Sequence, residues 1–150
     1  KAPIFMARQF VKHQIGLVWN EESRRYIDDE PEFYIPKELR GRPVNAKQGS
    51  NGVLESSELF TDMIVSESVR CLDLYEQLLE SNVAPEQARM VLPQNVMTNW
   101  MWTGSLVAFA RVVKLRTDSH AQQEAQELAK LINDVVAPLY PVSWKALMES

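Results

Sequence analysis

The sequence predicts a mostly helical α+β fold in one domain, residues 1–150, with a small antiparallel or mixed sheet. Apolar residues recur at helical spacing over most of the second half of the chain. Short extended runs bounded by proline or glycine are few. The length of 150 residues and the hydrophobic fraction of 45% suit a single globular core.

The first predicted element is a helix that starts at Pro3, where the missing N–H of proline costs nothing. Ile4, Ala7 and Phe10 supply its apolar repeat. Gly16 interrupts this pattern, so residues 16–26 are predicted to form a loop that leads into extended chain.

Residues 32–36 resemble a short strand closed by Pro36. The stretch 37–52 is rich in glycine, proline and asparagine and predicts a long surface loop, a kind that is often functional. A long amphipathic helix is expected from Val53 to about Leu79, ended by Ser81-Asn82.

The remaining elements follow in quick succession. A short helix is predicted over 85–91 and a strand within 95–102, and Thr103 or Ser105 is expected to cap the next helix. Asp118 or Ser119 is expected to cap another, running to about Val136, and residues 141–148 form the last. The side chains expected to face inward from these helices are Leu106, Phe109, Val112, Leu115, Ala125, Leu128, Leu131 and Ile132.

Composition excludes several classes of protein. Sixteen basic and twenty acidic residues give a net charge of -4, which disfavours a general nucleic-acid binder. No apolar run approaches the ~20 residues that span a bilayer, and no signal peptide is recognised, so no membrane partner is expected. The single cysteine, Cys71, is expected in the core and indicates a reducing, cytoplasmic location.

The segment 12–26 concentrates groups that suit a nucleotide. Arg24 and Arg25 offer planar forks of donors for phosphate, and Ser23 adds a neutral donor. Trp19 and Gln14 offer a flat surface and an amide for a ring. A solvated charged turn is the alternative interpretation of the same residues.

Two further segments carry candidate residues. Arg116 ends one predicted helix, and Ser119 with His120 opens the next, which suits an anion; helix capping is the alternative interpretation, favoured when these residues are taken alone. Arg89 is the single charge in the apolar run 88–93, where it serves a structural ion pair or a ligand.

Other common sites lack support. The sequence has no glycine-rich phosphate loop and no paired cysteines, and its two histidines, His13 and His120, lie far apart, so no metal site is expected. Nothing in the sequence fixes Ser23 and His13 as a nucleophile and base.

Taken in order, these segments resemble the flavin-dependent thymidylate synthases, also called the thymidylate synthase complementing protein family. The family's Arg-His-Arg triplet and following Asn-Glu-x-x-Ser-x-Arg residues are matched by 12–14 and 20–26. Its Ala-Arg-x-Val-Leu-Pro segment is matched by 88–93, and its Trp-Thr pair by Trp102-Thr103. Its Leu-Arg-x-Asp-x-His-Ala-Gln-x-Glu segment is matched by 115–124.

The resemblance implies roles for individual residues. The positions similar to those that bind dUMP in the family are Gln9, Glu21, Ser23, Arg24, Arg25, Arg89 and Arg116. Among these, Ser23 and Arg116 are the implied catalytic residues, with Ser23 orienting substrate rather than attacking it. The positions similar to those that contact FAD or shape the folate pocket are Lys12, His13, Gln14, Ile15, Ser105, Arg111 and His120.

The resemblance also implies an activity: FAD-dependent reductive methylation of dUMP to dTMP. Methylenetetrahydrofolate is the implied carbon donor, NADPH the implied reductant, and the family assembles as homotetramers with shared active sites. The family carries an N-terminal segment ahead of the residues matched here, so the sequence is expected to correspond to its central and C-terminal part.

Departures from the family pattern motivate other hypotheses. Lys12 and Gln14 replace the two arginines of the triplet, one extra residue precedes Asn20, and Ser105 replaces an asparagine. A non-catalytic dUMP/flavin-binding or assembly subunit derived from the family is the alternative, and a helical interaction domain without a ligand is the third hypothesis.

Overall fold

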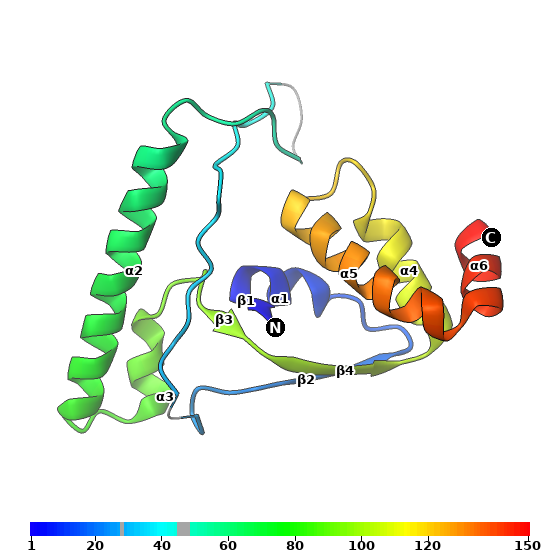
Figure 1. Cartoon of the computed structure of the whole chain (residues 1–150). Coiled ribbons are helices and arrows are strands. Elements are labelled where there is room, and N and C mark those ends of the chain that lie inside the picture. Colours follow the sequence, from blue (N-terminus) through cyan, green and yellow to red (C-terminus); the bar gives the residue numbers. More distant parts are fainter. Residues whose placement is uncertain (28, 45–48) are drawn as a thin grey trace. The chain divides into compact units, whose positions relative to one another are not determined.

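The computed structural model describes residues 1–27, 29–44 and 49–150 (Figure 1). These residues form six α-helices, one 3-10 helix and two two-stranded sheets, which confirms the mostly helical α+β prediction. The chain divides into two compact units. Unit 1 comprises Lys1–Gln9, Asn20–Arg40 and Val53–Met101, and unit 2 comprises Phe10–Trp19, Gly41–Gly52 and Trp102–Ser150.

Unit 1 begins with β1 (Ala2–Pro3), which pairs antiparallel with β3 (Met97–Thr98). The predicted N-terminal helix is confirmed as α1 (Ile4–Phe10), although Pro3 lies in the strand just before it. Met6, Ala7 and Phe10 are at most 2% exposed, so the apolar repeat of the sequence marks the buried face of α1.

The long helix of unit 1 is α2 (Ser57–Glu80), which starts four residues later than predicted. Val53 instead forms a bridge with Arg40, and the amide of Leu54 donates to the carbonyl of Leu39, which keeps these residues extended. The helix ends where expected, because Asn82 takes a left-handed conformation with φ 61°. Cys71 lies on α2 and is half-buried rather than fully buried as predicted.

The predicted short helix is confirmed as α3 (Pro85–Ala88), continued by the 3-10 helix η1 (Arg89–Val91). The predicted strand at 32–36 is wrong: only Phe33 pairs, in an isolated bridge with Val96. Pro31 precedes this segment and Pro36 ends it, and neither has an N–H for a ladder, which limits its pairing.

The predicted loop at 16–26 is also wrong in part, because β2 (Leu17–Glu21) is a strand. It pairs with β4 (Trp100–Gly104), which with β3 accounts for the strand predicted in 95–102. Leu17 and Trp19 are half-buried and alternate with exposed Val18. This alternation is a strand pattern, but it spans too few residues beside Gly16 to be recognised.

Unit 2 contains α4 (Leu106–Arg116), α5 (Gln123–Leu139) and α6 (Pro141–Glu149), which pack against one another (Figure 1). Ser105, not Thr103, caps α4: its Oγ accepts from the amide of Ala108 at 3.2 Å. The core of these three helices is centred on Ala110, Val113 and Trp144.

Three predictions about the helices of unit 2 are wrong. Leu115 and Leu131 are 59% and 62% exposed, not buried. Helix α5 starts at Gln123 rather than after Asp118 or Ser119. The Asp118 carboxylate accepts from the amide of His120 at 2.8 Å, which closes a local turn and delays the helix. The final helix is confirmed as α6.

None of the described helices combines the length and the apolar character that a membrane span requires.

Candidate functional site

The candidate residues divide between the two units, and each group is described by itself. Unit 1 holds most of the residues predicted to bind substrate: Gln9, Glu21, Ser23, Arg24, Arg25 and Arg89. Unit 2 holds Arg116 and every residue predicted to contact the cofactor: Lys12, His13, Gln14, Ile15, Ser105, Arg111 and His120.

In unit 1, a pocket of about 650 Å³ opens beside the end of β2. We call it the Ser23 pocket. Its walls come from α1, from the segment that follows β2, and from the stretch between α3 and β4. Of the predicted substrate residues it brings together Glu21, Ser23, Arg24 and Arg89. Gln9 lies in α1 and is half-buried, outside the lining of this pocket.

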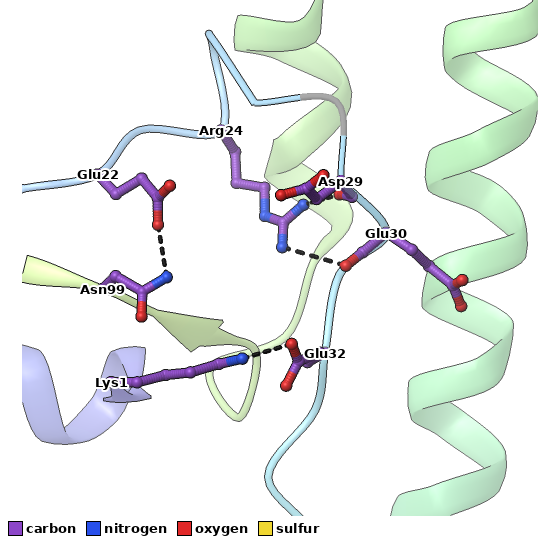
Figure 2. A network of polar contacts seen from close by, with 7 residues as sticks. All are labelled: Lys1, Glu22, Arg24, Asp29, Glu30, Glu32 and Asn99. Atoms are coloured by element: carbon purple, nitrogen blue, oxygen red, sulfur yellow. Dashed lines mark hydrogen bonds and ion pairs between the residues drawn. The ribbon is translucent and has the colours of Figure 1, made fainter.

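Consecutive residues at the end of β2 are fixed by side chains from the 89–99 stretch. Glu21 Oε1 accepts from the Thr98 hydroxyl at 3.0 Å. Glu22 Oε2 accepts from the Asn99 amide at 2.6 Å, and the backbone N–H of Glu22 donates to the Asn99 carbonyl (Figure 2). These bonds hold the strand end against β3 and set the direction in which the chain enters Ser23.

Two arginines donate hydrogen bonds to the hydroxyl of Ser23. Its Oγ accepts from Nη1 of Arg89 at 3.2 Å and from Nε of Arg25 at 3.3 Å. Arg89 also donates from Nε to the carbonyl of Glu86, and the Arg25 guanidinium lies 4.9 Å over the ring of Tyr26. A hydroxyl held between two cations is oriented as a hydrogen-bonding group toward an anion.

Arg24 takes a different role from the one expected of a ligand-binding arginine. Its guanidinium donates to the carbonyl oxygens of Asp29 and Glu30, which folds the chain after β2 back on itself (Figure 2). The acidic lining residues of the pocket also outnumber its cations, and Lys1 is paired with Glu32. The other arginines that line the Ser23 pocket are Arg89, which donates to Ser23, and Arg8.

In unit 2, a smaller pocket of about 200 Å³ is lined by the loop after α1 and by one side of α4. We call it the His13 pocket. It brings together predicted cofactor residues from distant segments: Lys12, His13, Gln14, Ile15 and Arg111. Leu17, Ala108 and Val112 complete its lining with apolar surface.

Two glycines allow the loop of the His13 pocket to approach α4 and β4. Gly16 has φ +76°, and a Cβ there would lie 3.2 Å from Cβ of Ala108. A Cβ on Gly104 would lie 2.4 Å from Leu17 and 2.6 Å from the carbonyl oxygen of Gly16. Ser105 donates its N–H to that carbonyl, so it fixes the loop as well as capping α4.

Arg116, the last residue of α4, contacts the same loop. Its Nε donates to Nε2 of His13 at 2.9 Å, and its guanidinium lies 5.6 Å over the ring of Phe10. Partial burial, and then the charge of Arg116, lowers the pKa of His13 below its usual 6.5. Burial also lowers the pKa of Arg116.

His120 is placed apart from these contacts. Its side chain is 83% exposed in the turn before α5, where Nδ1 lies 2.9 Å from the carboxylate of Asp118. Hydrogen bonds from the backbone and side chain of His120 lower the pKa of Asp118. The described structure therefore gives His120 a local partner but no contact with the lining of the His13 pocket.

Sequence reasoning missed the aromatic cluster beside His13. Trp102 makes edge-to-face contacts with Phe10, Trp19 and Phe109 at centroid distances of 6.0, 5.4 and 5.5 Å. Its Nε1 is buried and has no hydrogen-bond partner among the described residues. The Trp-Thr pair was a signal of this position, but its role required the fold. Thr98 and Asn99 were missed too, since neither belongs to a recognised motif.

The residues of the His13 pocket fit a ring system with polar edges. Lys12, Gln14 and Arg111 supply donors, and the apolar lining supplies a flat contact surface. Its volume is below the ~300 Å³ at the lower end of ligand sites, so the described residues line only part of such a site. No cluster of three or more metal-ligating side chains occurs among the described residues.

Comparison with known proteins gives consistent similarities. Residues 1–142 match the family described as thymidylate synthase complementing protein. The chain is 38% identical to the flavin-dependent thymidylate synthases of Thermosipho africanus and Thermus thermophilus, over 151 and 149 residues. These alignments cover 99% of this chain but 66% and 54% of those proteins, so the chain spans about half to two thirds of their length.

A solved structure is similar as well. It is the UMP/dUMP methylase PolB from Streptomyces cacaoi bound with 5-Br UMP, at a TM-score of 0.87 and 28% identity. The match covers 99% of this chain and 71% of that one. The same protein bound with 5-Br dUMP gives a TM-score of 0.85 and the same identity, with 68% of that chain covered.

Proposed function

Because the chain belongs to the thymidylate synthase complementing protein family, we propose that it serves FAD-dependent reductive methylation of dUMP to dTMP. The observation that carries the proposal is the His13 pocket, in which the segment 12–15 meets Arg111 of α4, with Arg116 bonded to His13. Segments far apart in the sequence thus combine donors and apolar surface in one place.

We assign the binding of dUMP to Arg89 and Arg116, with Gln9, Glu21, Ser23, Arg24 and Arg25 in supporting positions. Ser23 orients substrate: its Oγ is held by two arginines, and neither of these cations is a base that activates a nucleophile. Thr98 and Asn99 position Glu21 and Glu22, so they act on substrate through the β2 end.

We assign the flavin to the surface formed by Lys12, His13, Gln14, Ile15 and Arg111, with Ser105 holding the loop and His120 as a further contact. Bound FAD supplies the redox chemistry, with NADPH as the reductant and methylenetetrahydrofolate as the carbon donor. The protein residues bind and orient these molecules. Lys12 keeps a positive charge at the first triplet position, and Gln14 offers an amide at the third.

The small volume of the His13 pocket and an exposed apolar face on α2 both support a homotetramer with shared active sites. On α2, Leu59, Phe60 and Met63 are 61, 44 and 57% exposed. Clustered apolar side chains of this kind mark surfaces that another chain covers. A second copy of the chain supplies such a cover.

The test is to purify the chain, add FAD, and record the visible spectrum before and after adding dUMP. We expect a flavin band that stays with the protein and shifts with dUMP. Formation of dTMP is then measured by chromatography with methylenetetrahydrofolate and NADPH present. A folded protein that retains neither flavin nor dUMP contradicts the proposal.

A non-catalytic dUMP/flavin-binding or assembly subunit is the second candidate. The acidic excess around the Ser23 pocket and the substitution of both triplet arginines favour it. It predicts ligand binding without dTMP formation, and failure to complement a thymidine-requiring strain. Complementation by the chain excludes it.

A further inference from the structure

The side chains of His13 and Arg116 are in contact, although a protonated histidine and an arginine repel each other. The Nε–H of Arg116 donates to Nε2 of His13 at 2.9 Å. Arginine has only donors, so Nε2 must be the unprotonated nitrogen, and the proton of the neutral ring lies on Nδ1. Burial and the neighbouring cation lower the pKa of His13, which favours this neutral form.

Three aromatic contacts fix the imidazole ring and the guanidinium. The ring of His13 lies 6.1 Å from that of Phe10 and 6.4 Å from that of Trp102. The guanidinium of Arg116 lies over the same Phe10 ring, which is 0% exposed and closely packed in the core. The bond to His13 and the ring surface of Phe10 therefore both help to locate the arginine.

The imidazole of His13 and the ring of Phe10 are neutral partners, which distinguishes them from a carboxylate. A neutral acceptor and a phenyl ring orient the guanidinium without bringing a negative charge of their own. A positive charge held in a fixed direction in a half-buried setting is suited to an anionic ligand.

From this geometry we infer that His13 is a positioning residue for Arg116, its neutral Nε2 holding the guanidinium in the orientation that binds dUMP. The inference rests on the proposed function and deepens it. His13 then contributes to substrate binding through Arg116, in addition to shaping the cofactor surface.

The experiment measures dUMP affinity by calorimetry for the FAD-supplied full chain and for two variants. His13→Ala removes the acceptor, and we expect affinity to fall about tenfold, as for loss of a hydrogen bond to a charged group. His13→Gln keeps a neutral acceptor near the Nε2 position, and we expect affinity within about threefold of wild type. Equal losses in both variants, or none in His13→Ala, would overturn the inference.

A coupled variant separates positioning from general damage. Arg116→Lys keeps the positive charge but lacks the Nε–H, so His13→Ala and His13→Gln should bind dUMP equally in that background. A persistent difference between them would show that His13 acts independently of Arg116. Wild-type chain that binds no dUMP would instead contradict the proposed function.

Nuclear magnetic resonance gives a readout that needs no ligand. With ¹⁵N-labelled histidine, we expect His13 as the Nδ1–H tautomer in the wild-type chain, because Nε2 is the acceptor. In the Arg116→Lys variant, His13 should lose its preference for the Nδ1–H tautomer, while the rest of the spectrum should remain that of the folded chain. An Nε2–H tautomer in the wild-type chain would overturn the inference whatever the dUMP result.

Discussion

The hydroxyl oxygen of Ser23 accepts a hydrogen bond from Nη1 of Arg89 at 3.2 Å, across 66 positions of sequence. This bond joins the end of β2 to the 3-10 helix η1. Two segments that the sequence offered as separate candidates are thereby brought together in unit 1.

Replacement of Arg116 by alanine should largely abolish dUMP binding. The variant loses a charged donor whose hydrogen bonds are worth ~1.5–3 kcal/mol each. Calorimetry with dUMP measures the effect, and circular dichroism checks that the variant is folded. Unchanged affinity in a folded variant counts decisively against the assignment of Arg116.

Thr98→Val should weaken dUMP binding and lower stability by about 1–2 kcal/mol, because it deletes the donor to the Glu21 carboxylate without changing shape. Thr98 is 9% exposed, so water cannot fully replace the lost bond. Thr103→Val, at an exposed position on β4, is the matched control and should be near neutral. Urea unfolding compares the two, and equal effects would contradict the positioning role of Thr98.

Gly104→Ala should destabilise the chain by about 1–3 kcal/mol, because the added carbon overlaps Leu17 and a backbone oxygen that cannot move aside. Flavin retention should fall as well, since the displaced loop lines the His13 pocket. Gly52→Ala is the control, because nothing lies within 4 Å of its added carbon. A Gly104→Ala chain as stable as Gly52→Ala would contradict the close approach.

Stability should fall as the pH drops below 6.5, through His13. Its pKa is lower in the folded chain than its usual value, so below 6.5 the unfolded chain binds a proton that the folded chain does not. The loss of stability ends once the pH is below the pKa that His13 has in the folded chain. Above pH 6.5 the contribution of His13 to stability is constant. Besides Arg116, the charged groups among the described lining residues of the pocket are Lys12 and Arg111.

Urea unfolding at about pH 5 and about pH 7.5 tests this dependence, with His13→Gln as the control that cannot titrate. The wild-type chain should lose more stability between the two conditions than the variant does. Identical losses of stability in the two chains would mean that His13 does not contribute to the pH dependence.

Phe60→Glu on α2 should shift the chain toward smaller assemblies, because a charge opposes burial of the exposed apolar face. Sedimentation velocity measures the change. Val44→Glu, at a position 91% exposed outside any helix, is the control and should leave the assembly unchanged. A variant of Phe60 with the wild-type sedimentation pattern would contradict the use of this face in a homotetramer.

Helices were predictable from sequence where local signals agreed. The apolar repeat of α1, the Ser81-Asn82 stop of α2 and the Pro141 start of α6 each combine periodicity with a terminating or initiating residue. The errors arose where the conformation of a segment depends on pairing partners that are distant in sequence. Val53 pairs with Arg40, and residues 17–21 become a strand because β4 pairs with them.

The site was predictable in its parts but not in its contacts. The motifs pointed to His13 and Arg116, yet nothing in either segment indicates that Nε of Arg116 would form a hydrogen bond with Nε2 of His13. Asp118 looked like a helix cap, but its carboxylate closes a turn with His120 instead. The described loop residues 37–44 and 49–52 contain no helix or strand, as predicted apart from the bridge at Arg40, while positions 45–48, including Asn45, lie outside the described residues.

The edge-to-face pair of Trp19 and Trp102 has an optical consequence. Two indoles whose centroids are 5.4 Å apart at an interplanar angle of 75° couple their electronic transitions. Such a coupled pair produces a signed doublet in circular dichroism that separate indoles lack. Unit 2 therefore carries a built-in chromophore whose signal reports assembly of the aromatic cluster without any added label.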